Sequence, residues 1–108
     1  MHLSLEYIEK ELAGTVVPGH LADYRVYLAA LYSLHAAEMQ SILAVKPAIW
    51  LDIRGEKNSD KAADREWHAT EKGARETQLK WLLKRIDKLS AAIATKIRVM
   101  DSESRNQY

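Results

Sequence analysis

One segment constrains the fold of this chain more than any other. Residues 60–101 contain no proline and a single glycine, Gly73. The second half of the segment carries apolar residues three or four positions apart, the spacing of one packed stripe along a helix: Leu79, Leu82, Ile86, Leu89, Ile93, Ile97 and Met100. The pattern predicts one helix over 60–101, which at about 1.5 Å per residue is a rod of roughly 60 Å. Ser59 or Asp60 is expected to cap it, and the polar tail 102–108 is expected to fray.

A second long helix is predicted over residues 21–54. Its apolar stripe has the same helical spacing and consists of Tyr24, Leu28, Leu31, His35, Met39, Ile42, Ile49 and Ile53. Pro47 interrupts the stripe, and a proline inside a helix costs about 3 kcal/mol. We therefore expect a kink or a break at this position.

The expected architecture is all-α, in a single domain over 1–108. A short helix over 4–13 comes first, capped by Ser4 and closed by Gly14. A compact domain of this size has a radius of gyration of only ~13 Å, so a 60 Å helix does not fit inside a globule. We expect an elongated, coiled-coil-like antiparallel hairpin. Such a hairpin leaves apolar area uncovered, which favours a homo-oligomer or another partner helix.

Composition excludes several kinds of chemistry. The chain has no cysteine, so it holds no disulfide, iron–sulfur cluster or thiolate zinc site. It has no nucleophile-elbow motif and no phosphate-cradling glycine loop. His35 with Glu38, and His68 with Glu71, have the reverse of the Glu-x-x-His order of di-iron bundles and lack their further carboxylates. We expect no enzyme activity, no cofactor and no metal site.

The distribution of charge along the chain predicts where the protein resides. Glu6, Glu9 and Glu11 lie where a secretory signal needs an unbroken apolar run. Charged or polar residues also interrupt the later apolar stretches, which therefore fall short of the ~20 residues of a membrane span: Arg25, His35, Glu38 and Lys46. We expect a cytoplasmic protein with no membrane contact.

The net charge of +1 conceals two halves of opposite sign. Residues 1–56 carry 4 basic and 7 acidic side chains, and residues 57–108 carry 12 and 8. Lysines four apart form a basic ridge that has an aromatic side chain and an arginine beside it, made of Lys80, Trp81, Lys84, Arg85 and Lys88. Such a ridge contacts phosphates and stacks on a base. The other interpretation is that the ridge faces solvent and that its lysines cover Glu38 and Asp52.

The tryptophans suggest a surface for a protein partner. Trp81 is expected to pack inside the hairpin. Trp67 has mostly charged neighbours, which makes it a candidate anchor of the kind that dominates interface energy. His68 is adjacent to it, and Trp50 comes just before the loop. The predicted protein-binding residues are therefore Trp67, His68 and Trp50.

Part of the chain resembles a known class of proteins. Ser59–Gly73 (SDKAADREWHATEKG), the Lys- and Leu-rich helix after it, and the ending Ser104–Tyr108 (SRNQY) resemble small helical early proteins of tailed bacteriophages. Such proteins are often encoded near recombination genes, and they commonly bind a host protein, including nucleases and immune effectors. The resemblance implies an inhibitor or adapter in the host cytoplasm, for example a host-defence inhibitor of the anti-CRISPR kind that acts on a defence nuclease. A nucleic-acid-binding accessory protein of phage recombination or replication is the alternative.

Overall fold

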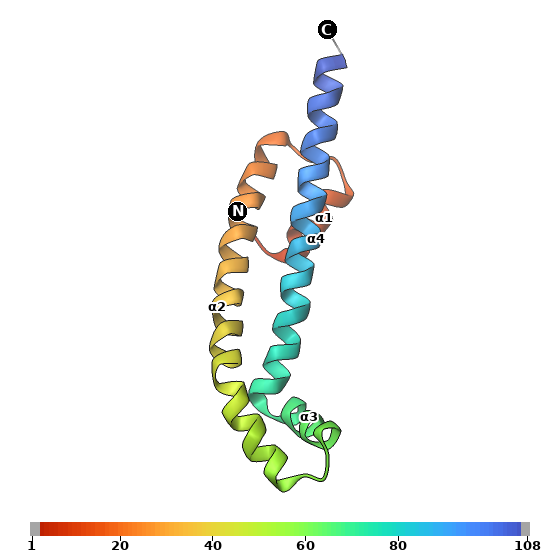
Figure 1. The fold of residues 1–108 in the computed structure, drawn as a ribbon. Helices are drawn as coiled ribbons and strands as arrows, with labels where there is room; N and C mark the ends of the chain where they lie inside the picture. Colours follow the sequence, from red (N-terminus) through yellow and green to blue (C-terminus); the bar gives the residue numbers. More distant parts are fainter. Residues whose placement is uncertain (1–2, 107–108) are drawn as a thin grey trace. The chain divides into compact units, whose positions relative to one another are not determined.

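The computed structural model describes residues 3–106, and this part of the chain holds four α-helices and no strand (Figure 1). The helices are α1 (Leu5–Ala13), α2 (Pro18–Glu56), α3 (Asp60–Ala69) and α4 (Glu71–Asn106). The predicted all-α class is confirmed. Two compact units share these helices: a terminal unit, Met1–Tyr32 with Lys84–Tyr108, and a central unit, Ser33–Leu83.

Helix α1 begins and ends as its sequence predicts. The Ser4 side chain accepts a hydrogen bond from the Tyr7 backbone N–H at 3.1 Å, which makes Ser4 the N-cap. The C-cap is Gly14, whose N–H donates to the Glu11 carbonyl. Gly14 has an extended backbone with a φ of −114°, so this helix end does not depend on the left-handed conformation available to glycine.

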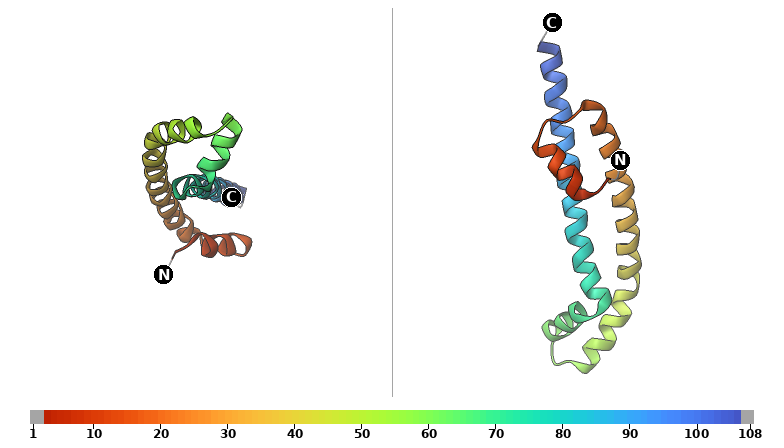
Figure 2. Two further views of the ribbon diagram at one scale, coloured as in Figure 1. Left: turned by 90° about the horizontal axis from the view of Figure 1, so that it is seen from below. Right: turned by 180° about the vertical axis from the view of Figure 1, so that it is seen from behind.

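In the terminal unit, α1 is tied to the second half of α4 by charge as well as by apolar burial. Arg85 of α4 forms ion pairs with Glu6 and Glu9, and the ammonium group of Lys96 donates to the carbonyls of Leu12 and Gly14 at the end of α1. The right-hand view of Figure 2 shows α1 beside the blue part of α4. The buried apolar residues of the unit are Leu5, Ile8, Val16, Leu21, Tyr24, Leu28, Ile86, Leu89 and Ile93.

Helix α2 starts three residues earlier than expected and is not broken at Pro47. Figure 1 shows that it bends in its yellow-green stretch but remains one helix. A proline at position 47 leaves the carbonyl of Leu43 without its helical donor. Both residues are exposed, so this carbonyl is accessible to solvent and the helix tolerates the lost hydrogen bond.

The predicted single helix over 60–101 is wrong, because the chain turns a corner at Thr70. The Thr70 hydroxyl donates to the Trp67 carbonyl at 2.6 Å and accepts from the Gly73 N–H at 3.0 Å. One side chain thus closes α3 and caps α4. Ser59, one of the two expected caps, caps α3 by accepting from the Ala62 N–H.

The far end of α4 also differs from the expectation. The tail was expected to fray from residue 102, but α4 continues as a helix to Asn106. Residues 107 and 108, the rest of that tail, lie outside the described residues.

Gly73 is needed where α4 touches the end of α3. A Cβ atom added at this position would lie 1.8 Å from the Trp67 carbonyl oxygen and 2.6 Å from the carbonyl carbon. Both atoms belong to the backbone, so no side-chain rotation relieves the clash. The corner therefore requires the one residue that has no Cβ.

Removing the Thr70 hydroxyl should weaken this corner. Thr70→Val keeps the shape of the side chain but loses both hydrogen bonds, and we expect the free energy of unfolding to fall by about 1 kcal/mol. Urea unfolding followed by circular dichroism measures the change. Thr95→Val, at an exposed position inside α4, is the matched control. Equal stability of the two variants would show that Thr70 caps nothing.

The core of the central unit joins α2, α3 and α4. Met39, Ile42, Trp67 and Leu79 form its buried cluster. Partly buried side chains pack against the cluster: Ile49, Trp50, Ile53, Leu82 and Leu83. Every residue of the cluster except Trp67 belongs to one of the two predicted apolar stripes.

Candidate functional site

A buried carboxylate lies at the centre of the central unit. Glu76 of α4 is 1% exposed and accepts two hydrogen bonds from the Lys46 ammonium group of α2, at 2.9 and 3.1 Å. It also accepts one from the indole N–H of Trp67 in α3, at 3.3 Å. Burial by itself raises the pKa of Glu76, but the hydrogen bonds from Lys46 and Trp67 outweigh it and hold the pKa below its usual value. This charged group therefore connects all three helices.

The expectation that Trp67 is an exposed anchor is wrong. Its side chain is 1% exposed, and the Lys46 ammonium nitrogen lies 5.5 Å from its ring centroid. The charged neighbours of Trp67 lie on the outer side of α3. Its inner side carries the buried residues of this helix, Ala63 and Trp67. Because the corner at Thr70 turns α3 back, the inner side of this polar helix still reaches the core.

The other two residues predicted to bind a partner differ in exposure. Trp50 is half-buried, packs against the core, and donates its indole N–H to Asp64 at 2.7 Å. His68 is exposed in the last turn of α3. Trp67, His68 and Trp50 therefore do not form one exposed aromatic surface.

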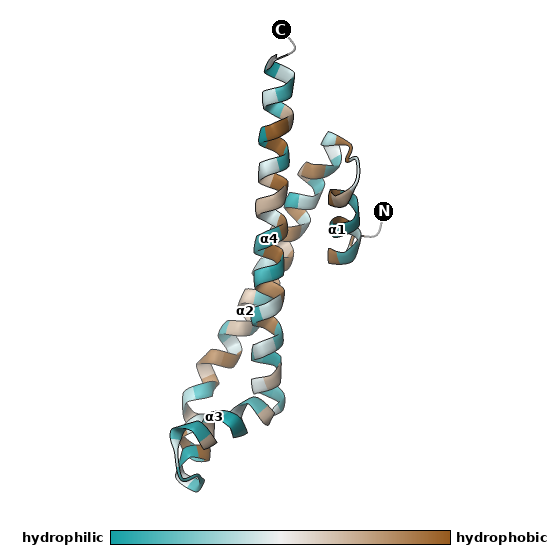
Figure 3. Cartoon of the chain, turned by 90° about the vertical axis from the view of Figure 1, so that its right-hand side faces the viewer, coloured by the Kyte–Doolittle hydropathy of each residue, from teal (hydrophilic) through white to brown (hydrophobic). Residues whose placement is uncertain are grey.

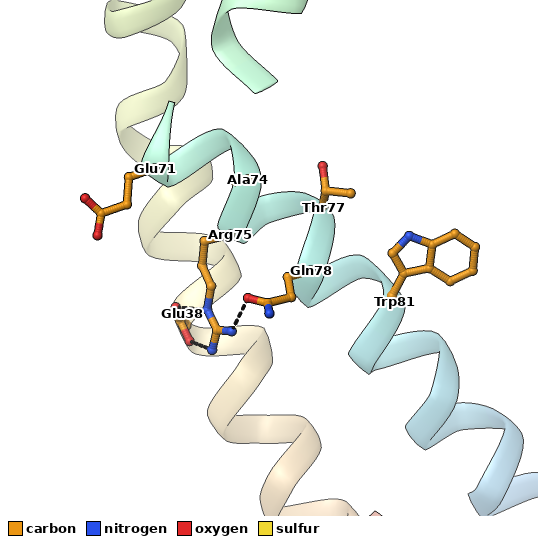
Figure 4. Close-up of a pocket in the computed structure, with 7 residues that line it drawn as sticks. All are labelled: Glu38, Glu71, Ala74, Arg75, Thr77, Gln78 and Trp81. Carbon is orange, nitrogen blue, oxygen red and sulfur yellow. Dashed lines mark hydrogen bonds and ion pairs between the residues drawn. The ribbon is translucent and has the colours of Figure 1, made fainter. Parts of the chain in front are cut away.

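Trp81 was expected to pack internally, but its side chain is 69% exposed. It borders an open depression of about 780 Å³ on the central unit (Figure 4). The lining residues are Glu38, Glu71, Ala74, Arg75, Thr77, Gln78 and Trp81. Trp81 lies two residues after Leu79, which at about 100° per residue places it on the side of α4 away from the apolar stripe. That spacing is a sequence signal for exposure.

Hydrogen bonds connect the side chains of the polar wall of this depression. Arg75 donates to both carboxylate oxygens of Glu38, at 2.7 and 2.8 Å, and to the side-chain oxygen of Gln78 at 2.8 Å. The hydrogen bond from Arg75 lowers the pKa of Glu38, and Glu38 in turn raises the pKa of Arg75. In Figure 4 the indole of Trp81 projects from α4 away from this pair. An exposed aromatic ring thus lies beside an ordered set of polar groups.

The predicted basic ridge is only partly available to a ligand. Lys80 lies 3.9 Å from Glu76, and Arg85 is engaged with Glu6 and Glu9. Lys84 and Lys88 are exposed. The cation that pairs with Glu38 is Arg75, which is not part of the ridge.

Within residues 3–106, no three His, Asp or Glu side chains gather closely enough to hold a metal ion. His35 lies on the core side of α2, where its Nδ1 atom is buried and has no hydrogen-bond partner.

The expectation that no segment is long and apolar enough to span a membrane is wrong by length and composition. Helix α2 contains an 18-residue window that meets both criteria, and only 11% of that window is buried. Figure 3 shows the middle of α2 coloured mainly pale to brown. Core helices of soluble proteins pass the same test, so the finding by itself gives no location.

Comparison of the chain with protein-family models, curated proteins and solved structures finds no match.

Proposed function

We propose that this chain is a non-enzymatic protein-binding module and that Trp81, with the depression beside it, is the surface that contacts the partner. The observation that carries the proposal is the 69% exposure of a tryptophan next to ordered polar groups. Tryptophan is enriched among the residues that dominate interface energy. Its indole offers a large exposed apolar area, while the polar wall supplies groups that fix orientation.

The proposed partner is a host protein such as a defence nuclease, bound in the cytoplasm of an infected cell. The resemblance of Ser59–Gly73 and Ser104–Tyr108 to early phage proteins supports this choice. The chain would act by occupying a surface of its target, as an inhibitor or an adapter. The antiparallel, coiled-coil-like hairpin stays a prediction, which small-angle X-ray scattering would test.

The competing proposal is an accessory protein that binds nucleic acid through α4. The exposed Lys84 and Lys88, on the same helix as Trp81, favour it. Arg85 weakens it, because two carboxylates of α1 already pair with its guanidinium. Phosphate contacts release bound counterions, so binding of this kind would weaken as salt rises, by an amount that grows with the number of contacts.

Capture from bacterial lysate distinguishes the two functions. Immobilised wild-type protein should retain a specific protein after nuclease treatment and at moderate salt. Trp81→Ala should reduce the retained amount at least about tenfold, because it removes the proposed anchor. Val99→Ala, a truncation at another exposed apolar position of α4, should retain it fully. Retention of nucleic acid alone, lost on nuclease treatment, would replace the proposal with its competitor.

A further inference from the structure

Part of α2 in the central unit presents an apolar side that no described residue covers. Three large apolar side chains are exposed on this side: Leu34 at 66%, Val45 at 40% and Leu51 at 64%. Single exposed apolar residues are ordinary, but three on one side of a helix within less than six turns mark an interaction surface.

This side of the helix also lacks charge. Between Ser33 and Leu51 the only Asp, Glu, Lys or Arg residues are Glu38 and Lys46. Glu38 pairs with Arg75 and Lys46 with Glu76, both on α4. Both charges are therefore satisfied within the unit, and the outer side of α2 presents only uncharged groups.

The helical period divides this surface into a centre and two flanks. At about 100° per residue, Ala37, Ala44 and Ala48 lie along the centre, opposite the buried Met39 and Ile42. All three alanines are exposed, and their small side chains allow another helix to approach closely. The same arithmetic places Leu34, Val45 and Asp52 on one flank and Leu51 on the other, with Arg54 at the outer edge of that second flank.

We propose that the occupant of this surface is a second copy of the chain, with the two α2 helices parallel about a two-fold axis that runs along them. In a parallel pair each flank meets the opposite flank of the other copy, so Asp52 faces Arg54 of the second copy. An antiparallel two-fold brings each flank against itself and gives no such pair. The charges on the flanks therefore select the parallel arrangement.

The two charged groups are free to pair in this way. Asp52 is exposed and has no ion pair with any described residue. Arg54 uses Nε for Asp60 and one terminal nitrogen for the Lys57 carbonyl, which leaves its other terminal nitrogen for Asp52. A lipid surface fits less well, because helices that lie on membranes carry basic residues beside the apolar face. Here one flank carries a carboxylate, Asp52, which anionic headgroups would repel.

The mass and orientation of the assembly test the proposal. Light scattering should give twice the chain mass for the wild type. Ala44→Glu places two carboxylates face to face, so the dimer dissociation constant should rise at least about tenfold. The helical content should not change, because Ala44 is exposed in the single chain. Ala91→Glu, an equally exposed alanine on α4, should leave the dimer intact.

Disulfide cross-linking measures the relative orientation of the two α2 helices. The chain has no cysteine of its own, so only the introduced cysteines can react. Under mild oxidation Ala37→Cys and Ala48→Cys should each give a disulfide-linked dimer, because a parallel pair brings every central position against itself. Ala91→Cys should not. A monomeric mass at the highest soluble concentration would overturn the proposal, as would a dimer that neither central variant cross-links. Binding of the monomer to vesicles of phosphatidylcholine and phosphatidylglycerol, abolished by Leu34→Glu, would overturn it in favour of a lipid surface.

Discussion

Gly73→Ala is expected to lower the free energy of unfolding by about 3 kcal/mol, because the new methyl group cannot fit against the α3 backbone. The added Cβ would lie 1.8 Å from the Trp67 carbonyl oxygen. Overpacking against a side chain costs about 1–3 kcal/mol, and a backbone obstacle has less freedom to move. The corner must therefore open, which displaces the Trp67 side chain and breaks its hydrogen bond to Glu76. Urea unfolding and near-ultraviolet circular dichroism of the tryptophans measure both effects.

A second glycine provides the control for this prediction. Gly55, near the end of α2, has nothing within 4 Å of an added Cβ, so Gly55→Ala should be neutral or stabilise by up to about 1 kcal/mol. The comparison of the two variants also distinguishes a corner at Thr70 from the single straight helix predicted over 60–101. If residues 60–101 formed one straight helix, Gly73→Ala would stabilise it just as Gly55→Ala does. A stabilising Gly73→Ala would contradict the corner.

Lys46→Met is expected to have the other large effect, because it removes the main partner of a buried charge. Glu76 is 1% exposed and would keep only the Trp67 N–H and the more distant Lys80. Breaking a buried ion pair by removing one partner costs about 3–5 kcal/mol, and we expect about 3 kcal/mol at neutral pH. Lys61→Met, at an exposed position of α3, should change stability little.

The pH dependence of this effect has a definite sign. The pKa of Glu76 is lower in the folded wild type than in the unfolded chain, so its ionisation stabilises the fold above about pH 4.5. That contribution is lost as the pH falls through the folded pKa. In Lys46→Met a protonated Glu76 is no longer a buried charge, so the difference between variant and wild type should shrink in acid. A difference that stays constant from pH 7 to pH 3 would show that the loss of stability does not come from the charge on Glu76.

The sequence predicts the helical class, the two apolar stripes and the caps well, because these depend on neighbours along the chain. Ser4 and Ser59 are recognisable as caps from the residues after them. The corner at Thr70 is not recognisable in the same way. A glycine inside a helical pattern usually costs only a little stability, and the requirement at Gly73 arises from a contact with the end of another helix.

For two tryptophans the observed exposure is the reverse of the predicted one. The corner at Thr70 accounts for Trp67, and helical spacing accounts for Trp81. Neighbours along the chain suggest that Trp67 is exposed, yet the turn at Thr70 buries it against α2 and α4. Trp81 has leucines next to it in sequence but lies off the stripe that they form. The exposure of a large side chain depends on which face of its helix packs against another helix. Helical spacing predicts this for Trp81 but not for Trp67.

The affinity of the captured partner for three forms of the chain tests the proposed function most directly. Wild type, Trp81→Ala and the double variant Lys84→Glu/Lys88→Glu would each be titrated with that partner by calorimetry at low and at raised salt. Our account predicts that Trp81→Ala costs about 2 kcal/mol, roughly a 30-fold loss, while the double variant and salt have little effect. An unchanged affinity for Trp81→Ala, together with steep loss on lysine reversal and with salt, would contradict it.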